Sequence, residues 1–80
     1  MHEIRAIIPP DCVSEAARLA HAAGITRVIV AEVFVDGSDE RRRLLSVETS
    51  TPKARAFVEA FLGSPMLTQT DYTLTSREVS

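Results

Sequence analysis

The sequence has little of what stabilises many small proteins. Cys12 is its only cysteine, so no disulfide forms within the 80 residues. A domain of this length hides only about 60 to 65% of the surface that its unfolded chain exposes, which leaves the fold marginal on its own. We therefore expect one small domain spanning residues 1–80, stabilised further by partner subunits or by a larger chain around it.

Long apolar runs and an excess of basic charge are also absent. The longest apolar stretch, Val28 to Val35, is interrupted by Glu32 and is far shorter than the roughly 20 residues that a membrane-spanning helix needs. The N-terminus lacks the basic stretch and apolar core of a secretory signal. The net charge of −2 and pI of about 5.6 argue against general affinity for nucleic acid or anionic lipid. We expect an isolated domain that is soluble and cytoplasmic, with no nucleic-acid partner.

No set of residues specifies a reaction. Cys12 lies near a predicted helix N-terminus, where a thiolate can be stabilised, but neither a second cysteine nor any asparagine is present to assist it. It is better explained as a small buried thiol. His2, His21 and Cys12 are the only nitrogen or sulfur ligand candidates, and none is paired at metal-ligand spacing. We expect no enzyme, and no catalytic, cofactor or metal site.

What the chain does contain is an alternation of strand and helix patterns. A period of two at residues 2–8 is followed by prolines that begin a helix, which ends at Gly24. Thr51 before Pro52 is typical of an N-cap, and Gly63 of a helix end. The predicted elements are a strand at 2–8, a helix at 10–23, strands at 25–35 and 41–49, a helix at 52–62 and a strand at 67–79.

This order of elements is that of the ferredoxin-like fold. Strand, helix, strand, strand, helix, strand predicts an α+β sandwich, a four-stranded antiparallel sheet with both helices on one face. We expect the sheet order 4-1-3-2, with the first and third strands central and parallel to each other. RNA readout by such a sheet needs paired aromatic residues on the central strands, and neither has one.

The run Arg41-Arg42-Arg43 follows an acid-rich turn. Successive strand residues point to opposite faces, so the three side chains cannot form one flat patch. Three acidic residues between 36 and 40 balance the three arginines. The pattern favours a solvated hairpin end with weak ion pairs, and leaves docking of an anion or a partner as the alternative.

The second predicted strand is apolar on both faces, although the helices can cover only one of them. An apolar patch on the uncovered face usually marks a contact surface. We expect self-association through this open face or through the edge of the second strand. The predicted interface residues are Ile7, Val28, Val30, Phe34 and Leu44.

Charged residues are also expected on the open face, namely Arg5, Glu32, Arg42 and Glu48. Cross-strand ion pairs are the favoured interpretation of this polar set. The alternative is a small stand-alone enzyme or ligand-binding protein that uses these residues, because paired carboxylates can perform acid-base chemistry.

Three segments carry a resemblance that covers nearly the whole chain: "MHEIRAIIPPDCVSEAARLAHAAGI", "LLSVETSTPKARAFVEAFL" and "DYTLTSREVS". They resemble the N-terminal soluble domain of a bacterial and archaeal family of uncharacterised hydrophobic membrane proteins, domain of unknown function three-eight-nine. The hairpin "DGSDERRR" departs from the more neutral turn of that family.

The resemblance implies an excised piece of a longer membrane protein, with a membrane domain C-terminal to Ser80 and this domain on the cytoplasmic face. The implied function is a non-catalytic regulatory or assembly module, and small-ligand sensing is added by analogy with other ferredoxin-like regulatory domains. We expect it to form a homo-oligomer.

Overall fold

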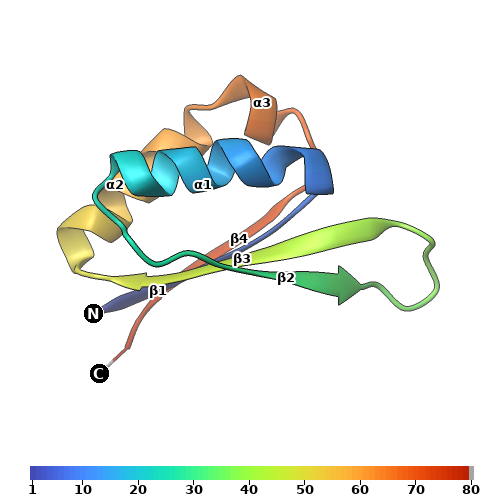
Figure 1. Cartoon of the computed structure of the whole chain (residues 1–80), viewed down its shortest axis with the longest axis horizontal. Helices are drawn as coiled ribbons and strands as arrows, with labels where there is room; N and C mark the ends of the chain where they lie inside the picture. The colour runs from blue at the N-terminus through green and yellow to red at the C-terminus, as the bar shows by residue number, and fades with distance from the viewer. Residues whose placement is uncertain (80) are drawn as a thin grey trace.

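The computed structural model describes residues 1–79, which form a sheet with helices on one face (Figure 1). In chain order the elements are β1 (His2–Ile8), the 3₁₀ helix η1 (Pro10–Cys12), α1 (Val13–Ala22), β2 (Ile29–Phe34), β3 (Arg41–Thr49), α2 (Thr51–Leu62), α3 (Pro65–Thr68) and β4 (Thr73–Glu78).

The sheet has the order β2-β3-β1-β4, which is the predicted order read from the other edge. Every neighbouring pair is antiparallel, so the α+β ferredoxin-like prediction is confirmed. The expectation that β1 and β3 are parallel is wrong. A right-handed crossover through α1 makes β2 parallel to β1, and the hairpin then reverses β3 relative to both.

Two predicted strand boundaries are also wrong. β2 begins at Ile29 rather than residue 25, because Ile25 is buried against the core in the connection after α1. β4 begins at Thr73 rather than residue 67, because residues 65–68 form the one-turn helix α3. The Ser64 carbonyl accepts hydrogen bonds from the backbone N–H groups of Leu67 and Thr68, which close that turn. The buried residue Leu67 therefore belongs to a helical turn and not to a strand.

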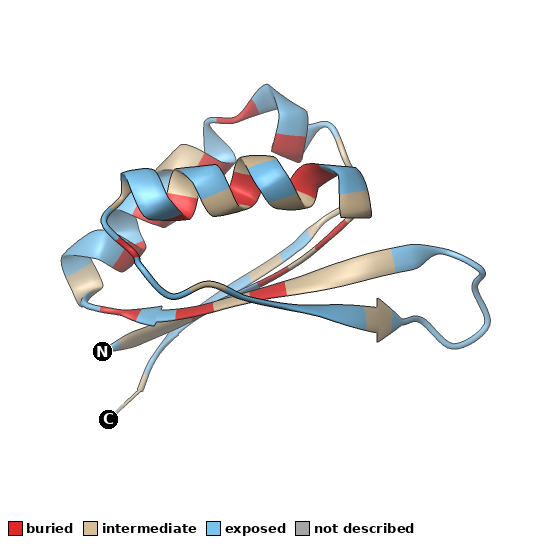
Figure 2. Cartoon of the chain, viewed as in Figure 1, coloured by how far each residue is buried: buried red, intermediate tan, exposed pale blue. Residues whose placement is uncertain are grey.

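The core lies between the sheet and the two longer helices (Figure 2). α1 contributes mainly alanine, which lets it approach the sheet closely, and α2 contributes two phenylalanines. The rings of Phe57 and Phe61 meet edge to face at 6.2 Å, and those of Phe61 and Tyr72 at 5.3 Å. Cys12 is buried in this core, as predicted for a small structural thiol. The buried apolar side chains are Ile4, Ala6, Ile8, Cys12, Ala16, Ala20, Ile25, Leu45, Val47, Ala54, Phe57, Phe61 and Leu67.

The β2–β3 hairpin projects past the helix layer, where neither of its faces is covered (Figures 1 and 2). Each residue of β2 is exposed or half-buried, whereas β3 becomes buried toward its C-terminal end. Gly37, with φ of +84°, provides the left-handed residue that the turn between these strands requires. The hairpin is thus the part of the fold with the most accessible side chains.

Candidate functional site

The strand register decides which side chains share a face of the sheet. Residues directly opposite each other in an antiparallel pair lie on the same face. Val30 lies opposite the buried Leu45, and Phe34 lies opposite Arg41, so these β2 residues are on the helix-bearing face. They remain exposed because the helices do not extend over the hairpin.

The prediction that the five interface residues form a single surface on the open face is therefore wrong. Ile7 and Leu44 lie opposite each other on the open face, as predicted. Val30 and Phe34 lie on the other face, and Val28 packs partly against the core. A shift of one residue in the pairing of a strand moves each of its side chains to the other face of the sheet. Because β2 is apolar on both faces, its sequence does not indicate which side chains point toward the helices.

The open face instead carries a different apolar group, which we name the open-face band: Ile7, Ile29, Ala31, Val33 and Leu44. Ala31, Leu44 and Ile7 form one row across β2, β3 and β1. Ile29 and Val33 lie two residues on either side of Ala31, and hence on the same face.

The predicted polar set is also divided. Arg5, Arg42 and Glu48 alternate with buried residues and lie on the open face, but Glu32 lies opposite Arg43 on the helix-bearing face. The Glu32 carboxylate forms an ion pair with Arg43 Nη2 at 3.3 Å. Glu32 and Glu48 thus point away from each other, and the structure does not assemble a carboxylate pair from the four residues.

The three consecutive arginines have three different environments. Arg42 is held most firmly, since only 12% of its side chain is exposed. It donates a hydrogen bond from Nη1 to the Asp71 carbonyl and one from Nη2 to Glu40 Oε2, both at 2.9 Å. Arg43 is paired with Glu32. Arg41 is exposed and forms no ion pair with any residue that the structure describes.

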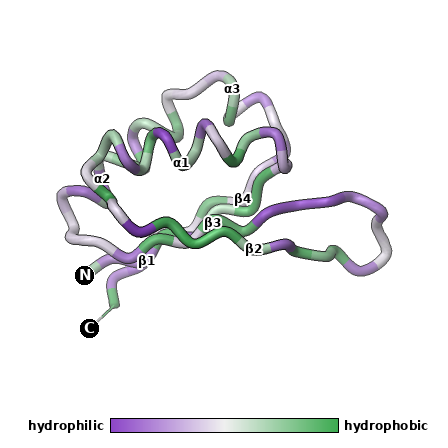
Figure 3. Tube along the Cα trace, viewed as in Figure 1, coloured by the Kyte–Doolittle hydropathy of each residue, from purple (hydrophilic) through white to green (hydrophobic). Residues whose placement is uncertain are grey.

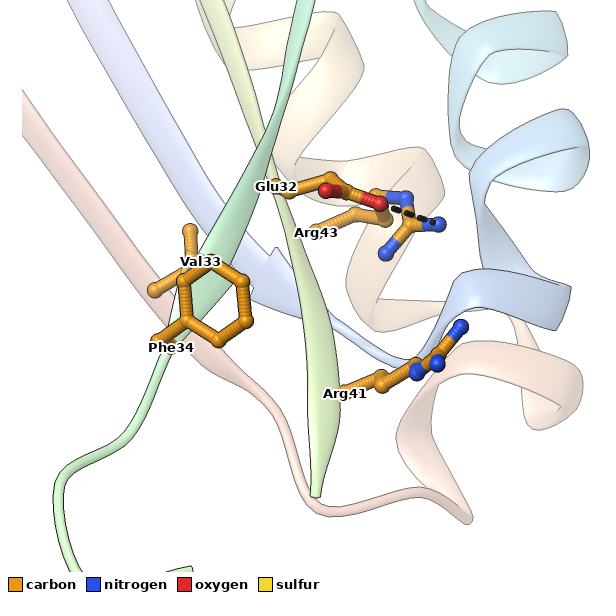
Figure 4. A pocket seen from close by; sticks show the side chains of 5 residues that line it. All are labelled: Glu32, Val33, Phe34, Arg41 and Arg43. Atoms are coloured by element: carbon orange, nitrogen blue, oxygen red, sulfur yellow. Dashed lines mark ion pairs between the residues drawn. The ribbon is translucent and has the colours of Figure 1, made fainter. Parts of the chain in front are cut away.

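A shallow hollow of about 150 Å³ lies next to the turn of the hairpin, on the helix-bearing side (Figure 4). We call it the hairpin pocket; it is lined by Glu32, Val33, Phe34, Arg41 and Arg43. Two guanidinium groups and one carboxylate leave it with a net positive charge. Phe34 is 87% exposed and lies across the strands from Arg41.

These side chains can perform recognition rather than bond chemistry. A guanidinium group binds phosphate or carboxylate through paired N–H donors, and an exposed aromatic ring stacks on a planar ring or a cation. The sequence pattern predicts Phe34 and Glu32 on the open face, and the structure places both on the helix-bearing face. Anion docking by the arginine run is the alternative that the sequence leaves open. The signal in the sequence is that Arg41 and Arg43 are two residues apart in a strand and therefore point to the same face.

Two further hollows lie elsewhere on the molecule. One of about 240 Å³ lies between α2 and the ends of β1 and β4, where His2 Nδ1 is 3.1 Å from Thr51 Oγ1. Another, of about 380 Å³, is lined by Met1, Arg27, Ile29 and two β3 residues. In the part of the chain that the structure describes, no three His, Cys, Asp or Glu side chains gather as metal ligands. No helix within residues 1–79 has the length and apolar character to cross a membrane.

The backbone is similar to those of solved PII-like proteins. A putative PII-like signalling protein from Thermus thermophilus superposes with a TM-score of 0.82 at 8% identity, covering 95% of this chain and 82% of that one. CPII from Thiomonas intermedia K12, solved with ADP, AMP and acetate, gives 0.80 at 14% identity, covering 94% and 81%. Its apo form, a nitrogen regulatory PII-like protein, gives 0.80 at 11%, covering 95% and 85%.

Similarity at these identities establishes the fold. No protein-family model and no curated protein matches the sequence.

Proposed function

We propose that this domain is a non-catalytic regulatory module that binds a small anionic ligand with a planar ring, of the adenine nucleotide class, at the hairpin pocket. The observation that carries the proposal is the exposed Phe34 ring across from Arg41, whose charge has no partner among the described residues. The solved CPII complexes with ADP and AMP support it, because they show that a chain with a closely similar fold binds such ligands.

The chemistry of the pocket fits a nucleotide in two parts. A hollow of about 150 Å³ is smaller than the roughly 300 to 1,000 Å³ of sites that enclose a whole ligand, so it receives one group of a larger molecule. A phosphate group binds Arg41. It also binds Arg43, which then gives up its ion pair with Glu32. The base then lies outside the hollow against Phe34, where stacking tolerates an open surface.

Two further parts of the proposal concern the protein around the module. Following the resemblance described above, the module precedes a membrane domain C-terminal to Ser80 and works at the cytoplasmic face. It also works as a homo-oligomer. A reading frame that continues past Ser80 into hydrophobic spans supports the membrane part, and a stop codon there contradicts it while leaving the ligand part unaffected.

Isothermal titration calorimetry with ADP and AMP at low ionic strength tests the ligand part. We expect saturable binding by the wild type, and a loss of about tenfold or more in affinity, equivalent to about 1.4 kcal/mol, for Arg41→Gln and for Phe34→Ala. Arg55→Gln is the matched control, since Arg55 is an exposed arginine on α2 outside the hairpin pocket. Absence of binding at millimolar nucleotide, or equal losses in Arg41→Gln and Arg55→Gln, would contradict the assignment.

A further inference from the structure

The hairpin pocket contains a carboxylate that loses its partner when a phosphate group binds. Glu32 Oε1 lies 3.3 Å from Arg43 Nη2, and Figure 4 shows the ion pair between the two side chains. In the proposed function a phosphate group binds Arg41 and Arg43, so nucleotide binding breaks this pair. Glu32 then either receives a new hydrogen-bond donor or faces the phosphate as a like charge.

The strand register places four of the pocket side chains in two rows on the helix-bearing face. Glu32 lies opposite Arg43 in one row, and Phe34 lies opposite Arg41 in the next. Residues directly opposite each other have Cβ atoms about 5 Å apart, and residues two apart along a strand are separated by about 7 Å. A carboxylate, an aromatic ring and two guanidinium groups are thus within reach of one small molecule.

Glu32 is the charged residue of an otherwise apolar strand. The segment Ile29–Phe34 reads IVAEVF, and Figure 3 shows the largely hydrophobic β2 beside the hydrophilic start of β3. β3 therefore supplies the positive charges of the pocket and β2 supplies its apolar contacts. The carboxylate on β2 opposes anion binding, which calls for an explanation of its place in the pocket.

Glu32 can change partners more easily than Arg43 can. The Glu32 side chain is 64% exposed and that of Arg43 is 25% exposed. Arg43 Nη1 also donates a hydrogen bond to the Arg42 carbonyl at 3.3 Å. An ion pair with so exposed a carboxylate is weak, so a ligand can displace it. Arg43 is thus the fixed member of the pair, and Glu32 is the member that rotates away.

The chemistry of a nucleotide indicates which donor the freed carboxylate receives. A carboxylate accepts hydrogen bonds and donates none, so Glu32 selects a group with O–H or N–H donors. The ribose joins the base to the phosphate, and its two hydroxyl groups are adjacent donors. Acidic side chains bind ribose hydroxyl groups in dinucleotide-binding folds. With the phosphate at the arginines and the base against Phe34, the ribose is the part of the ligand left for Glu32.

We propose that Glu32 determines specificity at the hairpin pocket by exchanging Arg43 for the ribose hydroxyl groups of the bound nucleotide. This assignment rests on the proposed nucleotide binding and narrows its ligand class to ribonucleoside phosphates. The same carboxylate acts against other anions. A ligand without ribose hydroxyl groups displaces Glu32 from Arg43 and offers it no donor in return, so the pocket discriminates against that ligand.

Calorimetry with ADP and with dideoxy-ADP, which lacks both ribose hydroxyl groups, tests the assignment. We expect the wild type to bind ADP about tenfold more tightly than dideoxy-ADP. Glu32→Gln keeps the size of the side chain and removes its charge. It should reduce the ratio to about twofold or less, chiefly by binding dideoxy-ADP more tightly, because Arg43 is then free. Glu59→Gln is the matched control and should keep the wild-type ratio, since Glu59 is exposed on α2 outside the hairpin pocket.

Arg43→Gln separates ribose recognition from phosphate binding. It removes a phosphate donor and leaves Glu32 in place, so we expect both ligands to bind more weakly with an unchanged ratio. Circular dichroism shows whether each variant is folded. Equal wild-type affinities for ADP and dideoxy-ADP, or a wild-type ratio retained by folded Glu32→Gln, would overturn the assignment alone. Absence of ADP binding by the wild type would overturn the proposed nucleotide binding and this assignment together.

Discussion

The three arginines at the start of β3 provide a sharp test of the register, because the same substitution at adjacent positions has three different expected costs. We consider Arg41→Gln, Arg42→Gln and Arg43→Gln. Arg42 loses two hydrogen bonds from a charged donor, a type that contributes about 1.5 to 3 kcal/mol each when fully effective. The acceptors on Glu40 and Asp71 belong to exposed residues, so water hydrates them when the guanidinium is removed. We therefore expect Arg42→Gln to lower the free energy of unfolding by about 1 to 2 kcal/mol.

The other two positions should cost less. The Arg43–Glu32 pair has an exposed carboxylate partner and a separation of 3.3 Å, so its loss should cost about 0 to 1 kcal/mol. Arg41 has no ion pair within the described residues, and we expect Arg41→Gln to leave the free energy of unfolding nearly unchanged. For ADP affinity the order reverses: Arg41→Gln should weaken binding most, and Arg42→Gln least.

Urea unfolding followed by circular dichroism measures these differences. A domain of 80 residues has a total stability of about 4 to 12 kcal/mol, so a loss of about 1 to 2 kcal/mol is a substantial part of it. With a denaturant slope of about 1 to 2 kcal/mol per molar, the unfolding midpoint of Arg42→Gln moves down by about 1 M.

The control is Asp71→Ala, which removes the exposed carboxylate 3.7 Å from Arg42 but keeps the carbonyl that Arg42 contacts at 2.9 Å. We expect it to cost less than Arg42→Gln. Equal stability losses at all three arginines, or a larger loss at Arg41 than at Arg42, would refute the assignment of the three side chains to alternating faces.

Two further predictions concern the core and the pH dependence of a surface pair. Phe61→Leu removes two edge-to-face ring contacts, whereas Phe57→Leu removes one. Each contact contributes about 0.5 to 1.5 kcal/mol in addition to the burial of apolar surface, so we expect Phe61→Leu to lower the stability measured in urea more than Phe57→Leu does. The opposite order would show that Phe61 is not the centre of the cluster with Tyr72. A hydrogen bond from Arg18 lowers the pKa of Glu15 below its ordinary value of 4.5, so the stabilisation is present above pH 4.5 and is lost as the pH falls through the lowered pKa. An NMR titration should show the pKa of Glu15 return toward 4.5 in Arg18→Gln, and an unchanged pKa would exclude that cause.

The elements that could be predicted from the sequence are those with strong periodicity or end signals. The alternation at residues 2–8 gave β1 with the correct buried face, and the boundaries of β3 agree with its prediction. Pro52 and Gly63 correctly bracketed α2, although Ser50 rather than Thr51 occupies the N-cap position. α3 was missed because Leu67, considered locally, fits a strand as well as it fits a buried helical turn.

The candidate site was harder to predict, since it depends on which residue of β2 lies opposite which residue of β3. The two faces of β2 are almost equally apolar, so the hydrophobic pattern did not distinguish the helix-bearing face from the open one. Only the observed pairing of Glu32 with Arg43 and of Phe34 with Arg41 brings the hairpin pocket together. The length of the helices relative to the hairpin, which leaves Phe34 uncovered, is a tertiary property with no local signal.

Met1 and Val79 lie beside each other at the end of the sheet opposite the hairpin (Figure 1). The Val79 N–H donates a hydrogen bond to the Met1 carbonyl at 2.8 Å, which joins β4 to the start of β1. A tether attached at Met1 or at Val79, whether an affinity tag, a fluorescent protein or a solid support, therefore leaves from the same corner and orients the molecule in the same way. Residues 36–40 then point away from the support, so surface-immobilised protein presents its hairpin to solution whichever end is used.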